Sequence, residues 1–257
     1  MNFKKALITG ASSGIGHSLA TLMAKKKISL IITGRNNAQL VSLKEQLSDK
    51  VPVEILVGDL ENPTFLEDLL KKIESDSPDL IINNAGFGLY GDTDQIEPVK
   101  LNQMIDVNIK ALMAISIAGV KALKNKKQKG IILNISSAAS FLIFPSFSVY
   151  AATKAFINSF SQSLDVEVKP FNIRVLTSCP GMVETNFSKR AGAKKIVSEM
   201  NIMTADKAAE LMWEQIEKQK PLSIINWQYK LAIFLSKFVP KFWLAKRLQK
   251  NIQARQK

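Results

Sequence analysis

The fold of this chain is decided by the run Thr9-Gly10-Ala11-Ser12-Ser13-Gly14-Ile15-Gly16. The run follows a short apolar stretch and opens a segment with helical spacing, the setting in which a glycine-rich turn binds a pyrophosphate. One glycine permits a tight turn, the second lets the backbone approach the phosphates, and the third lets helix and strand pack closely. N–H groups at the helix start then face the anion. We therefore predict a nucleotide site that includes Gly10, Ser12, Ser13, Gly14, Ile15 and Gly16.

Outward from this turn, short apolar runs alternate with helical patterns along the chain. Such alternation predicts a parallel sheet covered by helices on both faces and joined by right-handed crossovers. The expected class is a single-domain, Rossmann-type, doubly wound α/β fold of about seven strands. The predicted strands are Phe3–Thr9, Ile28–Thr33, Val53–Val57, Leu80–Asn83, Ile131–Ser136, Ile173–Ser178 and Leu222–Asn226. The predicted helices are Ser13–Lys26, Ala38–Leu47, Pro63–Glu74, Val99–Leu123, Tyr150–Val168 and Ala205–Gln219.

The length of 257 residues suits one large α/β domain, which we assign to residues 1–226, followed by a basic extension at 227–257. The formal net charge is +13. Residues 221–257 contain no acidic residue and supply +8 of that charge. The basic residues are Lys230, Lys237, Lys241, Lys246, Arg247, Lys250, Arg255 and Lys257.

Two helical stretches are predicted in the extension, Trp227–Val239 and Lys241–Ile252, separated by Pro240. Apolar residues on one face and basic residues on the other are typical of an interfacial helix. Three interpretations stay open: peripheral membrane contact, a lid over the active site, and a subunit contact. Nucleic acid is disfavoured as a partner because no aromatic and basic platform is present.

Metal chemistry and disulfides are not expected from the composition. Cys179 is the one cysteine and His17 the one histidine, so neither an internal disulfide nor a histidine-based triad or metal site can form. No export signal is visible at the start of the chain. We expect a cytoplasmic protein without a metal, with membrane association through the extension left open.

Residues at the ends of predicted strands indicate the cofactor, because ligands bind beyond the carboxyl ends of a parallel sheet. No carboxylate ends the second strand, and Arg35 stands there instead, where a guanidinium can pair with a ribose 2′-phosphate. This predicts NADP(H), unless Arg35 merely faces solvent. Asp59 and Leu60 end the third strand, and Asn84, Ala85 and Gly86 follow the fourth. Asp59 can accept a hydrogen bond from the adenine amino group, and the small residues Ala85 and Gly86 can lie against the ribose. Either segment could instead cap the helix that follows it.

Catalytic chemistry is indicated by Tyr150 and Lys154, which lie four residues apart at the head of a predicted helix and so share one face. A nearby ammonium and an oxidised nicotinamide would lower the pKa of the phenol from about 10, so we expect Tyr150 to exchange protons near neutral pH. Ser137, just after the fifth strand, can donate to the same substrate oxygen. Together they predict a carbonyl and alcohol oxidoreductase.

With these motifs in place, residues 3 to about 226 resemble the short-chain dehydrogenase/reductase family. The resemblance rests on TGASSGIG, NNAG, Asn108 in DVN, Ser137, YAATK and Pro180-Gly181, in that order. It implies that Lys154 also binds the nicotinamide ribose, and that Asn108 holds a water in a proton relay to Lys154. It further implies cofactor contacts by Pro180, Gly181, Val183 and Thr185, although Thr185 could instead cap its own loop. A homodimer or homotetramer is expected.

The substrate is predicted to be a small hydrophobic carbonyl or alcohol, including lipid-like compounds. Phe87, Leu89, Tyr90 and the stretch 140–147 are largely apolar and follow strands, which is typical of a pocket lining. Several of them could instead pack under the loops or against another subunit. A second function class is a regulatory protein that senses NADP(H) without turnover and acts through its basic tail. The complete Ser137, Tyr150 and Lys154 set favours the enzyme.

Overall fold

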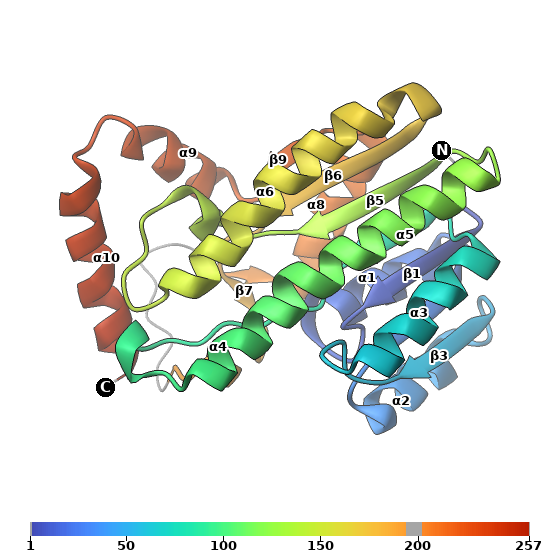
Figure 1. The fold of residues 1–257 in the computed structure, drawn as a ribbon, viewed down its shortest axis with the longest axis horizontal. Coiled ribbons are helices and arrows are strands. Elements are labelled where there is room, and N and C mark those ends of the chain that lie inside the picture. Colours follow the sequence, from blue (N-terminus) through green and yellow to red (C-terminus); the bar gives the residue numbers. More distant parts are fainter. Residues whose placement is uncertain (1, 194–201, 257) are drawn as a thin grey trace.

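A seven-stranded parallel sheet forms the centre of the computed structural model, which describes residues 2–193 and 202–256 (Figure 1). The strand order is β3-β2-β1-β4-β5-β6-β9, with every pairing parallel. Each of the seven predicted strands is therefore confirmed, as is the doubly wound class. The strands are β1 (Lys5–Thr9), β2 (Ser29–Gly34), β3 (Val53–Val57), β4 (Leu80–Asn83), β5 (Gly130–Ile135), β6 (Ile173–Cys179) and β9 (Leu222–Ile224).

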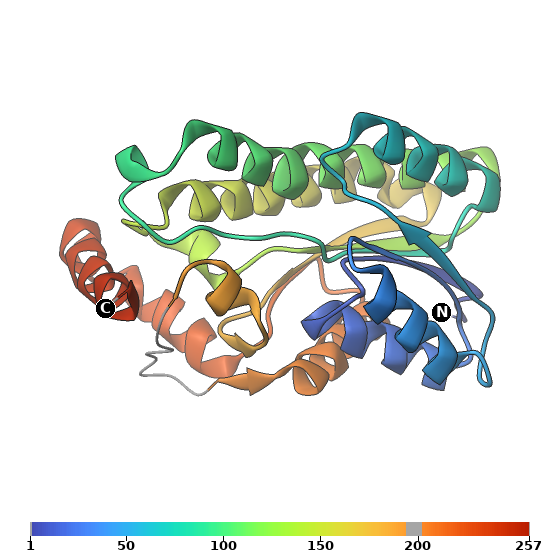
Figure 2. The same ribbon diagram turned by 90° about the horizontal axis from the view of Figure 1, so that it is seen from below.

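Helices cover both faces of the sheet, as Figure 2 shows edge-on. One layer holds α1 (Gly14–Lys25), α2 (Asn37–Leu47) and α8 (Ala205–Lys218). The other holds α3 (Pro63–Asp76), α5 (Leu112–Asn125) and α6 (Ser148–Val168), with α4 (Pro98–Ile105) leading into α5. The strand order reverses between β1 and β4, and in such folds the ligand cleft lies beyond the carboxyl ends of the strands at this switch point.

Alternate side chains of β1 show why the central strands are apolar throughout. Ala6 and Ile8 pack with Leu19 of α1 in one buried cluster, whereas Leu7 packs with Ile73 of α3 in the cluster on the other face. Since successive residues of a strand point to opposite faces, a strand buried on both sides must be apolar at every position.

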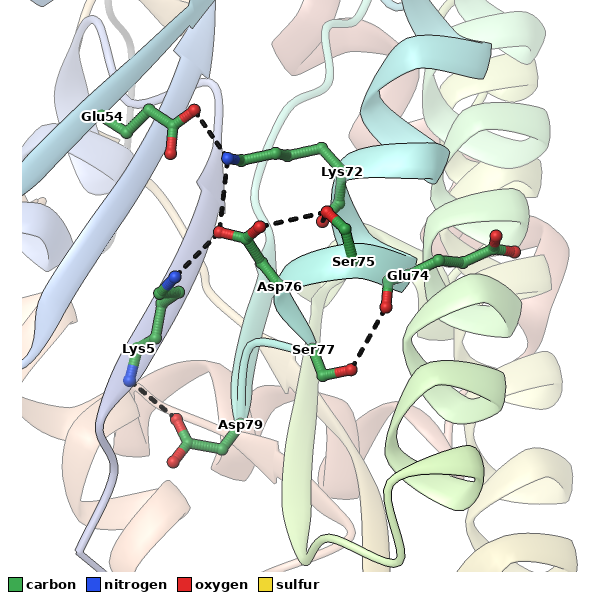
Figure 3. A network of polar contacts seen from close by, with 8 residues as sticks. All are labelled: Lys5, Glu54, Lys72, Glu74, Ser75, Asp76, Ser77 and Asp79. Atoms are coloured by element: carbon green, nitrogen blue, oxygen red, sulfur yellow. Dashed lines mark hydrogen bonds and ion pairs between the residues drawn. The ribbon is translucent and has the colours of Figure 1, made fainter.

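A polar network fastens the amino-terminal edge of the sheet (Figure 3). The Asp76 carboxylate at the end of α3 lies 2.8 Å from Lys5 Nζ and 3.4 Å from Lys72 Nζ. Lys72 also reaches Glu54 of β3 at 2.8 Å. Asp79 accepts from the backbone N–H of Lys5 at 3.0 Å. These contacts tie α3 to β1 and β3 at the edge away from the cleft, so we regard them as structural.

The helix predicted over Val99–Leu123 is longer and less regular than expected. It runs from Pro98 to Asn125 as α4, a π-helical turn at Asp106–Ala111, and α5. This helix is long and apolar enough to cross a membrane, but more than half of its apolar window is buried in the protein. A core helix passes the same test, so the observation is weak evidence for a span.

Several short elements lie near the carboxyl ends of the strands. They include a two-stranded sheet of β7 (Val183–Glu184) and β8 (Met203–Thr204), the short α7 (Phe187–Arg190), and a 3-10 turn at Ala138–Phe141. The extension forms α9 (Trp227–Ser236) and α10 (Lys241–Gln256), which confirms two helices divided at Pro240. Both lie beyond the carboxyl ends of the strands (Figure 1).

Candidate active site

A cleft of about 1600 Å³ opens beyond the carboxyl ends of the strands. It brings together the loops after β1 to β6, which are far apart in the sequence. Gly16 and Asn108 are the only predicted site residues that do not line it. Those that do are Gly10, Ser12, Ser13, Gly14, Ile15, Arg35, Asp59, Leu60, Asn84, Ala85, Gly86, Ser137, Tyr150, Lys154, Pro180, Gly181, Val183 and Thr185.

The glycine-rich turn has the geometry that a bound phosphate requires. Gly10 and Gly14 have φ values of +67° and +57°, a region that side chains disfavour. A Cβ on Gly14 would lie 2.8 Å from Cγ2 of Thr185, so a larger residue would close the turn. Ser13 precedes α1 but makes no side-chain cap, which leaves the first N–H groups of the helix directed to the cleft. The turn therefore fits the pyrophosphate of a dinucleotide.

Gly16 and Asn84 hold the turn in place from behind. A Cβ on Gly16 would collide with the carbonyl of Gly10, because α1 packs directly against the turn. The side chain of Asn84 donates to the carbonyls of Thr9 at 2.9 Å and Gly10 at 3.1 Å. Asn84 is thus a bridge between the ends of β1 and β4 rather than a helix cap.

Arg35 and Asp59 face each other at the predicted adenosine end of the cleft. Arg35 Nη1 lies 3.4 Å from Asp59 Oδ2, and Asp59 Oδ1 accepts from the backbone N–H of Glu61 at 3.1 Å. The cap of α3 is supplied by Asn62, so the alternative role of Asp59 as a helix cap is wrong. Asn36 caps α2 in the same way. Arg35 is largely exposed toward the cleft mouth and can turn to an anion.

Arg190 is a basic residue of this site that the sequence did not reveal. It lies at the end of α7, and its Nη2 donates to Ser13 Oγ at 3.4 Å across 177 residues of sequence. Burial and the nearby charge of Arg35 both lower the pKa of Arg190. Among the described carboxylates, none lies within ion-pair distance of Arg190. Two guanidinium groups therefore share one corner of the cleft, an arrangement that an anion would stabilise.

The catalytic residues meet at the other end of the cleft. Tyr150 and Lys154 lie on the first turns of α6, and Lys154 Nζ is 5.6 Å from the centre of the Tyr150 ring. Lys154 Nζ donates to the carbonyl of Ile135 at 2.9 Å, which fixes the ammonium beside the end of β5. Ser137 follows β5, hydrogen-bonds the Tyr150 side chain, and accepts from the backbone N–H of Ala139 at 3.1 Å. The structure thus brings together all three predicted catalytic side chains.

Burial controls the ionisation of both Tyr150 and Lys154. Burial raises the pKa of Tyr150, and the Ser137 hydrogen bond lowers it by less. Burial also lowers the pKa of Lys154 to about 8. Among the groups of the protein itself, the cost of burying a phenolate exceeds the favourable contacts. The decrease expected from the charge of an oxidised nicotinamide stays a prediction. Burial therefore favours the neutral phenol, the form that can donate a proton.

Asn108 lies in the π-helical turn behind this group. Its side-chain amide pairs with the backbone of Phe87, donating to the carbonyl at 2.9 Å and accepting from the N–H at 3.1 Å. It also donates to Thr153 Oγ1 at 3.1 Å. A Cβ on Gly86 would lie 2.9 Å from Asn108 Oδ1 and 3.4 Å from Lys154 Nζ, so these groups are neighbours. The predicted water relay stays a prediction.

Aromatic rings enclose Tyr150. Phe147 stacks on it with ring centroids 4.3 Å apart, and Phe187 lies on it at 5.4 Å. Tyr90 continues the stack on Phe147 at 4.2 Å. Apolar residues from the two predicted loops do line the cleft, although Phe141, Ile143 and Pro145 do not. The lining residues are Phe87, Leu89, Tyr90, Leu142, Phe144 and Phe147.

Loop residues after β6 contact both the turn and the extension. The hydroxyl of Thr185 accepts from the N–H of Phe187 at 3.2 Å, as in the capping alternative, while its methyl group lies on Gly14. Val183 in β7 packs against the core. Helices α9 and α10 also line the cleft, as the lid interpretation of the extension expects; their lining residues include Tyr229, Ile233, Leu244 and Leu248.

Comparisons with known proteins agree with this geometry. A family model described as short chain dehydrogenase matches residues 4–196. An uncharacterized oxidoreductase of Staphylococcus epidermidis is 32% identical over 206 residues, covering 79% of this chain and 88% of the relative. Two solved structures are similar. A short-chain dehydrogenase from Sphingobium yanoikuyae in complex with NADPH has a TM-score of 0.82 and 30% identity, covering 86% of this chain and 87% of its own. A bulky-bulky ketone specific alcohol dehydrogenase from Comamonas testosteroni has a TM-score of 0.79 and 26% identity, covering 87% of this chain and 86% of its own.

Proposed function

Because the chain belongs to the short-chain dehydrogenase family, we propose that it moves a hydride between NADP(H) and the carbonyl carbon of an apolar substrate. The observation that carries this proposal is the convergence of Ser137, Tyr150 and Lys154 at one end of a cleft whose other end is the glycine turn. The hydride is then transferred at the carbon, and the proton at the oxygen, of one carbonyl group.

The proposed roles follow from the contacts of each side chain. A bound nicotinamide dinucleotide supplies or accepts the hydride. The Tyr150 hydroxyl donates its proton to the carbonyl oxygen in reduction and accepts it in oxidation. Ser137 donates a hydrogen bond to the same oxygen and so stabilises its developing charge. Lys154 provides a positive charge beside the phenol, and Asn108 positions the loop at Phe87 and the Thr153 hydroxyl behind it.

We assign the cofactor preference to Arg35 and Arg190. No carboxylate of β2 is present to bind both ribose hydroxyls, and the two guanidinium groups can share a 2′-phosphate. A charge-assisted contact of about 1.5–3 kcal/mol corresponds to ~10- to 100-fold preference for NADPH over NADH. The Sphingobium relative was solved with NADPH, which agrees with this preference.

The substrate we propose is a bulky, apolar ketone or the matching secondary alcohol. The stacked rings of Tyr90, Phe147 and Tyr150, together with the inner faces of α9 and α10, give the cleft an apolar lining around a few polar groups. The Comamonas relative is described as specific for bulky ketones. We propose a cytoplasmic setting and a homodimer or homotetramer as the assembly. A regulatory protein without turnover has no support from the relatives, which are oxidoreductases.

The deciding experiment measures NADPH consumption with carbonyl compounds of increasing chain length. Tyr150→Phe should reduce the rate by at least ~100-fold, in the range that a general acid contributes. The substitution keeps the ring stacked on Phe147, so NADPH binding followed by fluorescence should stay within about threefold of the wild type, a factor too small to indicate loss of a contact. Wild-type rates in Tyr150→Phe would refute the proposed role of this residue.

A further inference from the structure

Helix α9 carries a stripe of exposed apolar side chains. Trp227, Leu231, Phe234, Leu235 and Phe238 follow the spacing i, i+4, i+7, i+8 and i+11, which places them on one face of the helix and the turn after it. Each is at least 48% exposed, and Trp227 and Phe238 exceed 70%. Phe234 and Phe238 contact each other edge to face at 5.5 Å.

The opposite face of the same helix lines the substrate end of the cleft. Tyr229, Ile233 and Ser236 point there, and Ile233 is only 7% exposed. With 3.6 residues per turn, these positions lie on the far side of the helix from Phe234 and Leu235. Helix α9 is therefore a single layer between the cleft and the surroundings of the protein.

Helix α10 extends the exposed surface and supplies positive charge. Phe242 and Trp243 at its start are 77% and 58% exposed. Lys230 and Lys237 lie along one edge of the α9 stripe, and Lys241 follows it. The sequence from 221 to 257 contains no acidic residue. Both helices lie at one end of the molecule (Figures 1 and 2).

We propose that the face formed by Trp227, Leu231, Phe234, Leu235, Phe238, Phe242 and Trp243 docks on an anionic lipid bilayer, and that the apolar substrate enters the cleft from that bilayer past α9. The route of entry rests on the proposed function, whereas the docking itself does not. Exposed aromatic and aliphatic side chains can insert at the level of the headgroups, and the lysines beside them attract anionic lipid. A protein partner of ordinary charge is less suited to this face, because the two helices that form it carry no carboxylate to pair with the partner's basic residues.

Binding is tested with the full chain and sedimented vesicles. Vesicles of phosphatidylcholine with one third phosphatidylglycerol should bind the protein at least ~10-fold more tightly than pure phosphatidylcholine, and added salt should weaken the binding. Trp227 and Trp243 are exposed and Trp213 is buried, so tryptophan emission should shift to the blue when these vesicles are added. No sedimentation and no spectral shift with anionic vesicles would overturn the proposal.

The docking face is tested with a triple variant that combines Phe234→Ser, Leu235→Ser and Phe238→Ser. None of these three residues lines the cleft. This variant should lose vesicle binding by at least ~10-fold while keeping its turnover of a short, water-soluble ketone. The matched control replaces two exposed apolar residues elsewhere, Val166→Ser and Phe171→Ser, and should bind vesicles as the wild type does. If both variants bind equally well, the face assignment is wrong.

Substrate entry is tested by presenting a long-chain ketone within the vesicles. The triple variant should then turn it over at least ~10-fold more slowly than the wild type, with equal rates on the soluble ketone. Equal rates on both ketones would overturn entry from the bilayer. No turnover of either ketone by the wild type would instead refute the proposed function. If the wild type is a dimer that does not bind vesicles and the triple variant is a monomer, the face is a subunit contact and the proposal fails.

Discussion

The ring of Tyr229 lies directly on Gly181, in the space that a Cβ at that position would occupy. Gly181 belongs to the loop after β6, and Tyr229 to the first turns of α9. The basic extension is therefore in contact with the loop that continues toward Thr185 and the glycine turn. Closure of the cleft by α9 depends on the absence of a side chain at residue 181.

Gly181→Ala should displace Tyr229 and loosen α9. Overpacking of this kind costs about 1–3 kcal/mol, and the cost falls on the docking of the extension rather than on the sheet. We expect proteolysis between β9 and α10 to become faster and the KM for an apolar ketone to rise. Tyr229→Ala makes room for the new methyl group, so the double variant should be less impaired than the sum of the single variants. Simple additivity would show that the two residues act separately.

Arg190→Ala should weaken NADPH binding by ~10-fold or more and leave NADH binding nearly unchanged, because only NADPH carries the 2′-phosphate. Arg35→Ala should act in the same way, and the two losses should not add if both groups hold one phosphate. Isothermal titration of the wild type, both single variants and the double variant with each dinucleotide gives the dissociation constants needed. Lys189→Ala removes the preceding basic residue, which does not line the cleft, and serves as the control. Equal weakening of both dinucleotides would assign Arg190 to the pyrophosphate.

NADPH binding to the free protein should weaken as the pH rises from 7 to 9. Burial lowers the pKa of Lys154 from its usual value near 10.5 to about 8, so the ammonium is lost within this range. A phosphate monoester, with a second pKa of about 6, is already about 90% doubly ionised at pH 7, so its own titration adds little. Fluorescence titration of NADPH at several pH values measures the change. Lys154→Arg keeps its charge throughout and should remove this dependence. A dissociation constant that does not change with pH in the wild type would contradict the predicted loss of charge.

Asp165→Asn should destabilise the fold without touching the cleft. Asp165 binds Arg174 through two hydrogen bonds of 2.8 and 2.9 Å and accepts from the N–H of Val175, and both side chains of the pair are nearly buried. Removal of one partner from a buried ion pair costs about 3–5 kcal/mol. Urea unfolding should show this loss, whereas Glu67→Gln, in an exposed pair with Lys71, should change the midpoint little. Equal midpoints for the two variants would mean that the buried pair contributes nothing.

The sequence predicted the sheet and most of the cleft because these features are local. Each strand is a short apolar run, and the glycine turn and the Tyr150 and Lys154 pair are read from spacing within a few residues. The carboxyl ends of parallel strands meet at one edge, so the loops after them could be assigned to one site. All of the predicted strands are present in the structure.

Other features depend on contacts that spacing does not encode. Arg190 meets Ser13 only because α7 folds back over the glycine turn. The raised pKa of Tyr150 results from burial, and enclosure by Phe147 and Phe187 cannot be read from their positions in the chain. The one signal for Arg190 in the sequence was its position, because it is a basic residue shortly after the loop that ends at Thr185.

The π-helical turn at Asp106–Ala111 determines how much change this segment tolerates. Such a turn accommodates one residue more than an α-helix of the same span, and it occurs often at functional sites. Deleting a residue within it would remove the extra residue and return the segment to regular α-helical winding, so the side chains inside the turn would change direction. Asn108 would then no longer face Phe87. The number of residues from Pro98 to Asn108 thus determines which way the Asn108 side chain points. Relatives that keep the pairing of Asn108 with the backbone of Phe87 should accept substitutions in this segment more readily than insertions or deletions.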